Sequence, residues 1–224
     1  MTTDLTAAIH PSTLGGLGGL YDVIYRRRDT RREFTGDPVA VDMLNRVLSA
    51  AHAAPSVGMS QPWDFVLVRS PETRGAFRDH VAHERNLFAA SLNGERAETF
   101  SRIKVEGISE SGLGIVVGYD PSRGGPQVLG RHAIDDAGLY SVICAIQNLW
   151  LAATAEGLGV GWVSFYREEF LRSLVGMPPH VRPVAWLCVG HVAGVPDVPD
   201  LERDGWRGRC PLQTVVHHEH YTAH

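Results

Sequence analysis

The residues best suited to chemistry lie near the N-terminus, where five arginines flank one aspartate in the run Arg26-Arg27-Arg28-Asp29-Thr30-Arg31-Arg32. A guanidinium group can bind phosphate through two parallel hydrogen bonds, so the run is a candidate nucleotide phosphate site. Charge runs are also typical of solvated helix faces, and the run alone favours neither interpretation. A later basic pair, Arg207 and Arg209, is interpreted by itself as surface charge.

Two other segments combine glycine with polar groups. Residues 55–63 (PSVGMSQPW) could present backbone and amide groups to a polar heterocycle, although turn chemistry explains their composition equally well. Residues 157–164 (GLGVGWVS) do not form a dinucleotide-binding GxGxxG motif, because Trp162 stands where glycine is required and a helix precedes the segment. They predict a helix end followed by a close approach of two backbones.

Other catalytic and metal-binding patterns are missing from the sequence, which contains no GxxxxGK, GxSxG or HExxH motif. A histidine-rich C-terminal stretch more often binds metal adventitiously than functionally, so we predict no metal site from His217, His218, His220 and His224. Three scattered cysteines without a CxxC pair indicate reduced thiols in a cytoplasmic protein. Cys144 is interpreted as a core thiol.

Composition favours a globular enzyme. With 224 residues, 44% of them hydrophobic, the chain can bury a sizeable core as one domain, residues 1–224. The net charge of −4 argues against a nucleic-acid binder. Residues 1–19 are predicted to be a flexible tail without the features of a signal peptide, and no apolar run approaches the roughly 20 residues of a membrane span. The Pro- and Gly-rich residues 196–224 either wrap a partner subunit or form a frayed end.

Hydrophobic spacing and the positions of Gly and Pro predict alternating helices and strands. Helices are expected at 21–28, between Pro38 and Pro55, at 70–92, 95–108 and 134–156, and at 168–175. Strands are expected at 63–69, 113–119, 160–165 and 184–192. The helix at 134–156 is apolar nearly all round, so we expect it to be buried at the centre. The more polar helix at 95–108 is expected at the surface or over an active site.

Taken in order, these motifs resemble the nitroreductase-like FMN superfamily from about residue 21 to about residue 221. The resemblance depends on RRxxR at 27–31, PSxxxxQPW at 55–63, GLGxGW at 157–162 and RxR at 207–209. One branch is more similar than the rest, because Asp29 replaces a usual serine and the chain has KVEGI at 104–108, VLGRH at 128–132 and GVGWVSF at 159–165. That branch destroys its flavin, converting reduced FMN and oxygen to 5,6-dimethylbenzimidazole, the lower ligand of vitamin B12.

The resemblance implies an α+β nitroreductase-like fold, with a central mixed, mostly antiparallel sheet flanked by helices. It also implies an intertwined homodimer with two flavin sites at the interface. Reduced FMN would be the substrate and O2 the co-substrate, with erythrose 4-phosphate as second product, no metal, and a separate flavin reductase supplying the reduced FMN.

The resemblance also assigns site residues. The phosphate would be held by Arg27, Arg28, Arg31 and Arg207. The isoalloxazine would contact Ser56, Gly58 and Gln61, from either subunit, and Gly161 would also bind the cofactor. Residues 95–108 would form a lid carrying Lys104, which could reach the flavin or remain solvated.

Two residues receive catalytic roles from the resemblance. Asp29 would accept a proton during oxidation and cleavage of the ribityl chain, or pair with its arginine neighbours, or do both. Ser164 would hydrogen-bond the flavin or the bound oxygen. Two alternatives remain open: an NAD(P)H-dependent nitroreductase or flavin reductase that retains FMN, and a non-catalytic flavin carrier.

Overall fold

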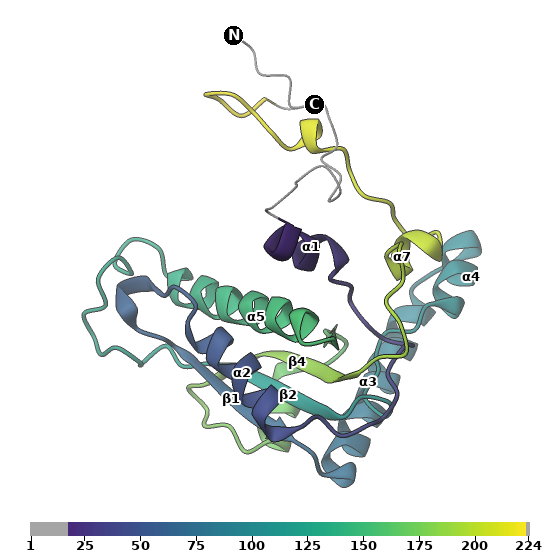
Figure 1. Ribbon diagram of the computed structural model, residues 1–224, viewed down its shortest axis with the longest axis horizontal. Coiled ribbons are helices and arrows are strands. Elements are labelled where there is room, and N and C mark those ends of the chain that lie inside the picture. Colours follow the sequence, from purple (N-terminus) through teal and green to yellow (C-terminus); the bar gives the residue numbers. More distant parts are fainter. Residues whose placement is uncertain (1–17, 223–224) are drawn as a thin grey trace.

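The computed structural model describes residues 18–222, in which four strands form one sheet with helices on both faces (Figure 1). The strand order is β1-β2-β4-β3. The strands are β1 (Trp63–Val68), β2 (Leu113–Tyr119), β3 (Leu158–Val163) and β4 (Arg182–His191). All three strand ladders are antiparallel, and the one parallel pairing in the described chain is an isolated bridge between Asp29 and Val160. The expected α+β architecture with a mostly antiparallel sheet is confirmed.

Two of the helix ends have residues with identifiable capping roles. Helix α3 starts where the Ser70 hydroxyl accepts a hydrogen bond from the Thr73 amide, with Pro71 in the first turn. Beyond the end of α5, Gly157 adopts φ +78°, a left-handed conformation that glycine reaches without penalty. The helices are α1 (Gly18–Arg26), α2 (Val41–His52), α3 (Pro71–Ala90), α4 (Gly94–Arg102), α5 (Ala137–Ala155), α6 (Glu168–Leu174) and α7 (Asp200–Arg203), with 3-10 turns η3 (Val57–Met59) and η4 (Leu212–Thr214).

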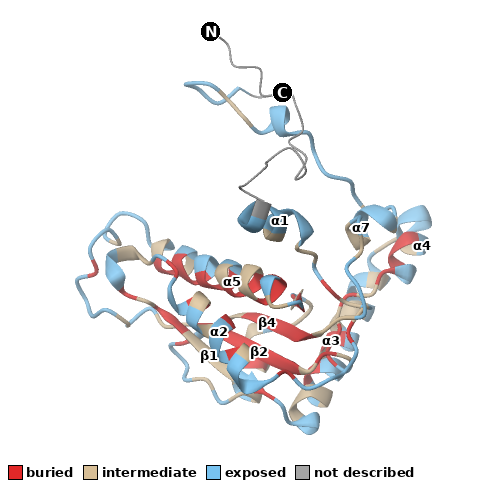
Figure 2. Ribbon diagram, viewed as in Figure 1, coloured by how far each residue is buried: buried red, intermediate tan, exposed pale blue. Residues whose placement is uncertain are grey.

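Each face of the sheet buries its own apolar cluster (Figure 2). Because side chains alternate between the faces of a strand, Ile115 and Val117 of β2 face one cluster while Val116 faces the other. The first cluster is shared with α2 and α5, and the second with α3, α6 and residues 103–108. The sheet is therefore the middle layer of three.

Helix α5 is long and apolar enough to cross a membrane, the one such helix among the described residues. Half of its length is buried inside the domain, where it packs against α2 and the sheet. Its position is that of a core helix in a globular fold, as the nearly uniform apolar pattern predicts.

Several boundaries differ from the sequence expectations; for example, β3 was expected at 160–165 and spans Leu158–Val163. The helix predicted at 95–108 is shorter, because the chain turns extended at Ile103 (φ −78°, ψ 125°) and then buries Ile103, Val105 and Ile108 as irregular backbone. Near the N-terminus, α1 begins at Gly18, so residues 18 and 19 of the predicted flexible tail are helical. The rest of that predicted tail lies outside the described residues.

Candidate functional site

The segment from Asp29 to Arg31 occupies the free edge of strand β3. The Thr30 amide donates a hydrogen bond to the Val160 carbonyl (2.9 Å), as a neighbouring strand would. The Trp162 amide donates to Asp29 Oδ1 (2.9 Å), and Arg31 Nη2 donates to the Trp162 carbonyl (2.9 Å). Backbone and side chains of this segment therefore satisfy edge groups that would otherwise be unpaired.

Gly161 lets the segment lie so close. A Cβ at this position would collide with the Thr30 carbonyl oxygen, and one at Gly159 would meet the Thr30 side chain at 2.9 Å. Gly159 and Gly161 of the GLGVGW motif thus make room on the same side of the strand. The close backbone approach predicted from this motif is confirmed, and it fixes the position of Asp29.

The Asp29 carboxylate is bound on two sides. Arg31 donates to both of its oxygens, at 3.0 Å to Oδ1 and 2.5 Å to Oδ2. The side chain keeps 43% of its surface accessible, but the surrounding protein still desolvates it. Burial raises the pKa of Asp29, while Arg31, the Trp162 amide and Arg27 oppose the rise. A carboxyl with a raised pKa that opens to a cavity is suited to proton transfer.

The remaining arginines of the run differ in what they contact. Arg27 lies over the Trp150 ring (5.0 Å to the centroid), and burial lowers its pKa, with further lowering by Arg209 and Arg28. Arg28 donates to the carbonyls of Tyr25 and Asp197, and its buried Nε has no hydrogen-bond partner in the described chain. Three cations thus crowd together with one hydrogen-bond donor unused, an arrangement that fits a phosphate group.

The C-terminal arginines are not equivalent. Arg209 approaches Arg27 closely enough to lower its pKa, whereas the exposed side chain of Arg207 makes no polar contact within residues 18–222. The role of Arg207 in phosphate binding therefore stays a prediction. Within a single chain, Arg209 is the member of the pair that lies near Arg27.

Asp29 and Arg31 open onto a cavity of about 380 Å³, a size typical of small-molecule sites. Ser164 and Lys104 also line it, and Lys104 forms an ion pair with Glu110 (2.5 Å). The Ser164 hydroxyl has no hydrogen-bond partner among the described residues, so it is free to bind a ligand. An aromatic wall completes the cavity, formed by Phe88, Phe100, Phe165 and Trp206.

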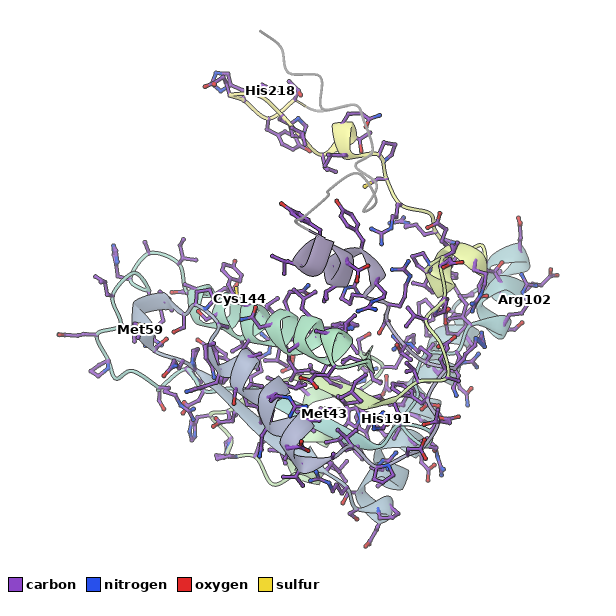
Figure 3. All side chains as sticks on the ribbon, in the orientation of Figure 1. Met43, Met59, Arg102, Cys144, His191 and His218 are labelled. Carbon is purple, nitrogen blue, oxygen red and sulfur yellow. The ribbon has the colours of Figure 1, made fainter. Side chains whose placement is uncertain are left out.

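Ser56, Gly58 and Gln61 lie elsewhere in the single chain. They surround η3, where the Ser56 hydroxyl accepts a hydrogen bond from the Gln61 amide (3.0 Å). Figure 3 shows Met59, in the same turn, and Arg102, at the end of α4 beside the cavity, at opposite ends of the molecule. Ser56, Gly58 and Gln61 therefore do not line the cavity of their own chain, and their contact with the isoalloxazine stays a prediction.

Sequence reasoning missed the C-terminal wall of the cavity. Pro199, Asp200 and Leu201 line it together with Trp206, in a stretch interpreted only as an irregular extension. Pro199 followed by Asp200 is a usable helix-start signal, but α7 has only four residues, too few to show helical periodicity.

The described residues contain no group of three or more His, Cys, Asp or Glu side chains that could hold a metal ion. In the C-terminal stretch, His217 contacts Thr222 and the ring of Tyr221, and His224 lies outside the described residues. We assign no metal ligands.

A family model named Nitroreductase family matches residues 24–191, most of the chain. The chain therefore belongs to the nitroreductase family, which confirms the sequence resemblance at the level of the family, and it is an oxidoreductase. Among its curated relatives, the 5,6-dimethylbenzimidazole synthase of Rhodospirillum rubrum is 38% identical over 92% of this chain and 95% of that protein. The synthase of the same name from Rhodobacter capsulatus is 35% identical over 87% of this chain and 93% of that protein.

A solved structure supports the fold. Iodotyrosine deiodinase bound to FMN and 3-iodo-L-tyrosine matches with a TM-score of 0.70 at 22% identity, covering 91% of this chain and all of that one. At this level of identity the match shows a shared architecture.

Proposed function

We propose that the chain converts reduced FMN and O2 to 5,6-dimethylbenzimidazole, the lower ligand of vitamin B12, and erythrose 4-phosphate. The observation that carries the proposal is the carboxylate of Asp29, held by Arg31 and the Trp162 amide at the wall of a ligand-sized cavity. The relatives named 5,6-dimethylbenzimidazole synthase, 32–38% identical to the chain, support the same reaction.

The described residues fit the parts of FMN. The phosphate would be bound where Arg27, Arg28 and Arg209 converge, because Arg28 and Arg209 both lower the pKa of Arg27 and the buried Nε of Arg28 has no partner in the described chain, so an FMN phosphate would offset the repulsion and accept that hydrogen bond. The ring would lie in the cavity, where aromatic side chains offer stacking surfaces and Lys104 and Ser164 offer polar contacts. Bound reduced FMN supplies both the electrons that reduce O2 and the carbon atoms of the product.

The protein's own groups would then orient the ligand and move protons. Asp29 accepts a proton from a ribityl hydroxyl, because its raised pKa brings its basicity closer to neutral pH. Ser164 donates or accepts a hydrogen bond at the flavin or the oxygen. The aromatic wall and residues 95–108, acting as a lid, keep water from the reacting atoms.

A homodimer would complete the site. Helices α1 and α5 expose apolar side chains, including Tyr21, Ile24, Tyr140 and Ile143. Beyond α7 the C-terminal segment leaves the body of the domain, as Figure 1 shows, and could lie on a second subunit. In such a dimer Ser56, Gly58 and Gln61 would reach the flavin of the partner, with reduced FMN supplied by a separate reductase.

The test is to mix the protein with reduced FMN in air and to measure dimethylbenzimidazole by mass spectrometry. We expect the parent protein to form it, and Asp29→Asn to lower the rate by about 100-fold or more, within the range of general-base effects. Asp64→Asn is the matched control, because Asp64 also pairs with an arginine, Arg123 at 2.6 Å, and lies outside the cavity. Product formation by Asp29→Asn at the parent rate would exclude the role of Asp29.

Two other functions give different results in the same assay. A nitroreductase or flavin reductase would retain yellow FMN and reduce it rapidly with NADPH. A flavin carrier would return the flavin chemically unchanged after aerobic incubation.

A further inference from the structure

A second carboxyl group, that of Asp200, lines the same cavity as Asp29. Asp29 belongs to the N-terminal segment beside β3, whereas Asp200 is the first residue of α7 in the C-terminal segment. The side chain of Asp200 is only 15% exposed. The fold thus brings two carboxyl groups from opposite ends of the chain to one site.

The two carboxyl groups have different partners. Asp29 accepts three hydrogen bonds, two from Arg31 and one from the Trp162 amide. In the described part of the chain, Asp200 accepts none of normal geometry, and its one ion pair is with Arg203 (2.8 Å). Such donors stabilise an ionised carboxylate, so at Asp29 they oppose the rise in pKa that burial causes, whereas Asp200 has only Arg203 as a direct partner in the described part of the chain.

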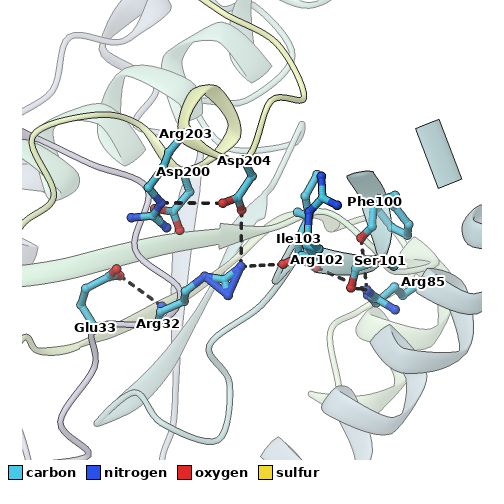
Figure 4. Close-up of polar contacts among 10 residues, drawn as sticks. All are labelled: Arg32, Glu33, Arg85, Phe100, Ser101, Arg102, Ile103, Asp200, Arg203 and Asp204. Carbon is cyan, nitrogen blue, oxygen red and sulfur yellow. Dashed lines mark hydrogen bonds and ion pairs between the residues drawn. The ribbon is translucent and has the colours of Figure 1, made fainter. Parts of the chain in front are cut away.

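Neighbouring charges add to this difference. Figure 4 shows Asp200 among Arg203, Asp204, Arg32 and Glu33, with Arg203 also near Asp204 (3.7 Å) and Arg32 paired with Asp204 (3.4 Å). Burial is the largest cause that raises the pKa of Asp200, and the two nearby carboxylates raise it further, whereas Arg203 and Arg32 lower it. The other charged groups of the cavity are Asp29, Arg31 and Lys104.

We propose that Asp200 is the proton donor of this cavity, working opposite Asp29 as the proton acceptor. When two carboxyl groups share a site, differences in their surroundings decide which is the acid and which the base. In the donor step the O–H bond of Asp200 breaks and an O–H bond forms on an oxygen of the bound molecule that has gained negative charge. No oxidant or reductant enters this step. Asp200 gives one proton to the bound molecule and Asp29 takes one from it, so the number of protons on the bound molecule does not change.

The assignment rests on the proposed function for its substrate, but its first test needs no flavin. Protein labelled with 13C at aspartate carboxyl carbons would be titrated by NMR, with Asp200→Asn identifying the Asp200 signal. We expect that signal to titrate above the ordinary aspartate range. Arg203→Gln removes a cation and should raise the midpoint, whereas Asp204→Asn removes an anion and should lower it, each by roughly half a pH unit or more.

The second test is the pH dependence of product formation at saturating reduced FMN. If a protonated acid is required, the rate of product formation declines at high pH, where that acid loses its proton. Asp200→Asn should remove this decline and lower the rate by at least about 10-fold. Asp200→Glu, which keeps an acid, should restore part of the rate and the decline. Asp204→Asn is the matched control, because Asp204 caps the C-terminal end of the same short helix and does not line the cavity; it should keep the maximal rate and move the decline to lower pH.

Each result decides between specific claims. An Asp200 signal within the ordinary range, or midpoints that move in the opposite directions, would overturn the assignment whatever the reaction is. An Asp200→Asn variant that folds, binds FMN and retains the parent pH profile would overturn it as well. A parent protein that forms no dimethylbenzimidazole would instead refute the proposed function, and the carboxyl titration would still decide the state of Asp200.

Discussion

The arginines between residues 26 and 32 have different partners, and Arg26 and Arg31 form ion pairs with Asp22 and Asp29. Arg28 and Arg32 donate hydrogen bonds to backbone carbonyls, of Asp197 and Arg102 respectively. Arg27 instead lies on Trp150, with Arg28 and Arg209 close enough to lower its pKa. The cost of holding these cations together is relieved when an anion binds, which makes Arg27 and Arg209 sensitive positions.

We therefore expect Arg27→Gln and Arg209→Gln each to weaken FMN binding by about 10-fold or more, the loss expected for one charge-assisted hydrogen bond. Binding of riboflavin, which has no phosphate, should change little. Flavin fluorescence titration measures both affinities. Arg182→Gln, which removes an arginine paired with Glu168 at 2.7 Å, serves as the control and should bind FMN like the parent. Equal losses for FMN and riboflavin would contradict a phosphate contact.

The raised pKa of Asp29 also predicts how stability depends on pH. A carboxyl group with a higher pKa in the folded state than its ordinary value of 3.8 binds its proton more tightly when folded. Its contribution to the free energy of unfolding therefore falls as the pH rises from 3.8 through the folded value, and stays low at higher pH.

Asp29→Asn removes this penalty, so at pH 7 the flavin-free variant should be at least as stable as the parent in urea unfolding. The stability advantage of the variant should shrink as the pH falls toward 3.8, the ordinary pKa of an aspartate. Asp64→Asn loses a surface ion pair instead and should be unchanged or less stable by up to about 1 kcal/mol. An Asp29→Asn variant less stable than the parent at neutral pH would show that the ion pair with Arg31 outweighs the cost of burial.

Single residues were predictable from the sequence where a short motif determines their surroundings. The glycines at 159 and 161 indicated a close backbone approach, which is present. The phosphate site indicated by the RRDTR run stays a prediction. Asp200 was not predictable, because its relation to Asp29 depends on two chain ends meeting beside β3. Local sequence patterns do not predict such a tertiary contact.

At the scale of elements, segments with one consistent pattern were predicted well. Strand β2 is apolar throughout, and its bounds agree with the expected 113–119. Helix α3 has both an N-cap serine and a proline in its first turn, and it begins where these residues predict. The predicted helix at 95–108 failed after Arg102, because tertiary burial of Ile103, Val105 and Ile108 overrides local helix propensity.

The contact between residues 29–31 and β3 depends on glycine. We expect Gly161→Ala to displace Thr30, lower the melting temperature and weaken FMN binding, because the added Cβ cannot share space with a backbone carbonyl. Gly75→Ala is the control, since Gly75 lies within α3 with nothing within 4 Å of an added Cβ; it should stabilise the protein by up to about 1 kcal/mol. Thermal unfolding and flavin titration of both variants test this, and normal FMN binding by Gly161→Ala would contradict the role of the contact.

At the scale of the whole molecule, the proposed dimer makes a prediction about thiols. The chain has three cysteines, of which Cys144 and Cys210 are exposed in the single subunit and Cys188 is buried, with a pKa raised to about 12 by burial. Cys144 lies on α5 beside the exposed Ile143. A second subunit packed on this face would cover it.

In a Cys210→Ser background we therefore expect Cys144 to react slowly with a thiol reagent at high protein concentration and faster on dilution. Sedimentation velocity on the same samples gives the fraction of dimer. Rapid labelling of Cys144 in a sample that sediments as a dimer would place the interface on another face. A monomer at all concentrations would refute the dimer itself.

The cavity can be labelled selectively through a lysine. Lys104 is the single lysine in the sequence, and it lies on the cavity wall with 27% of its side chain exposed. An amine-directed dye or crosslinker would therefore attach at one side chain, apart from the terminal amine. Shielding of that side chain by a bound molecule would turn the extent of labelling into a direct measure of occupancy, without any change to the sequence.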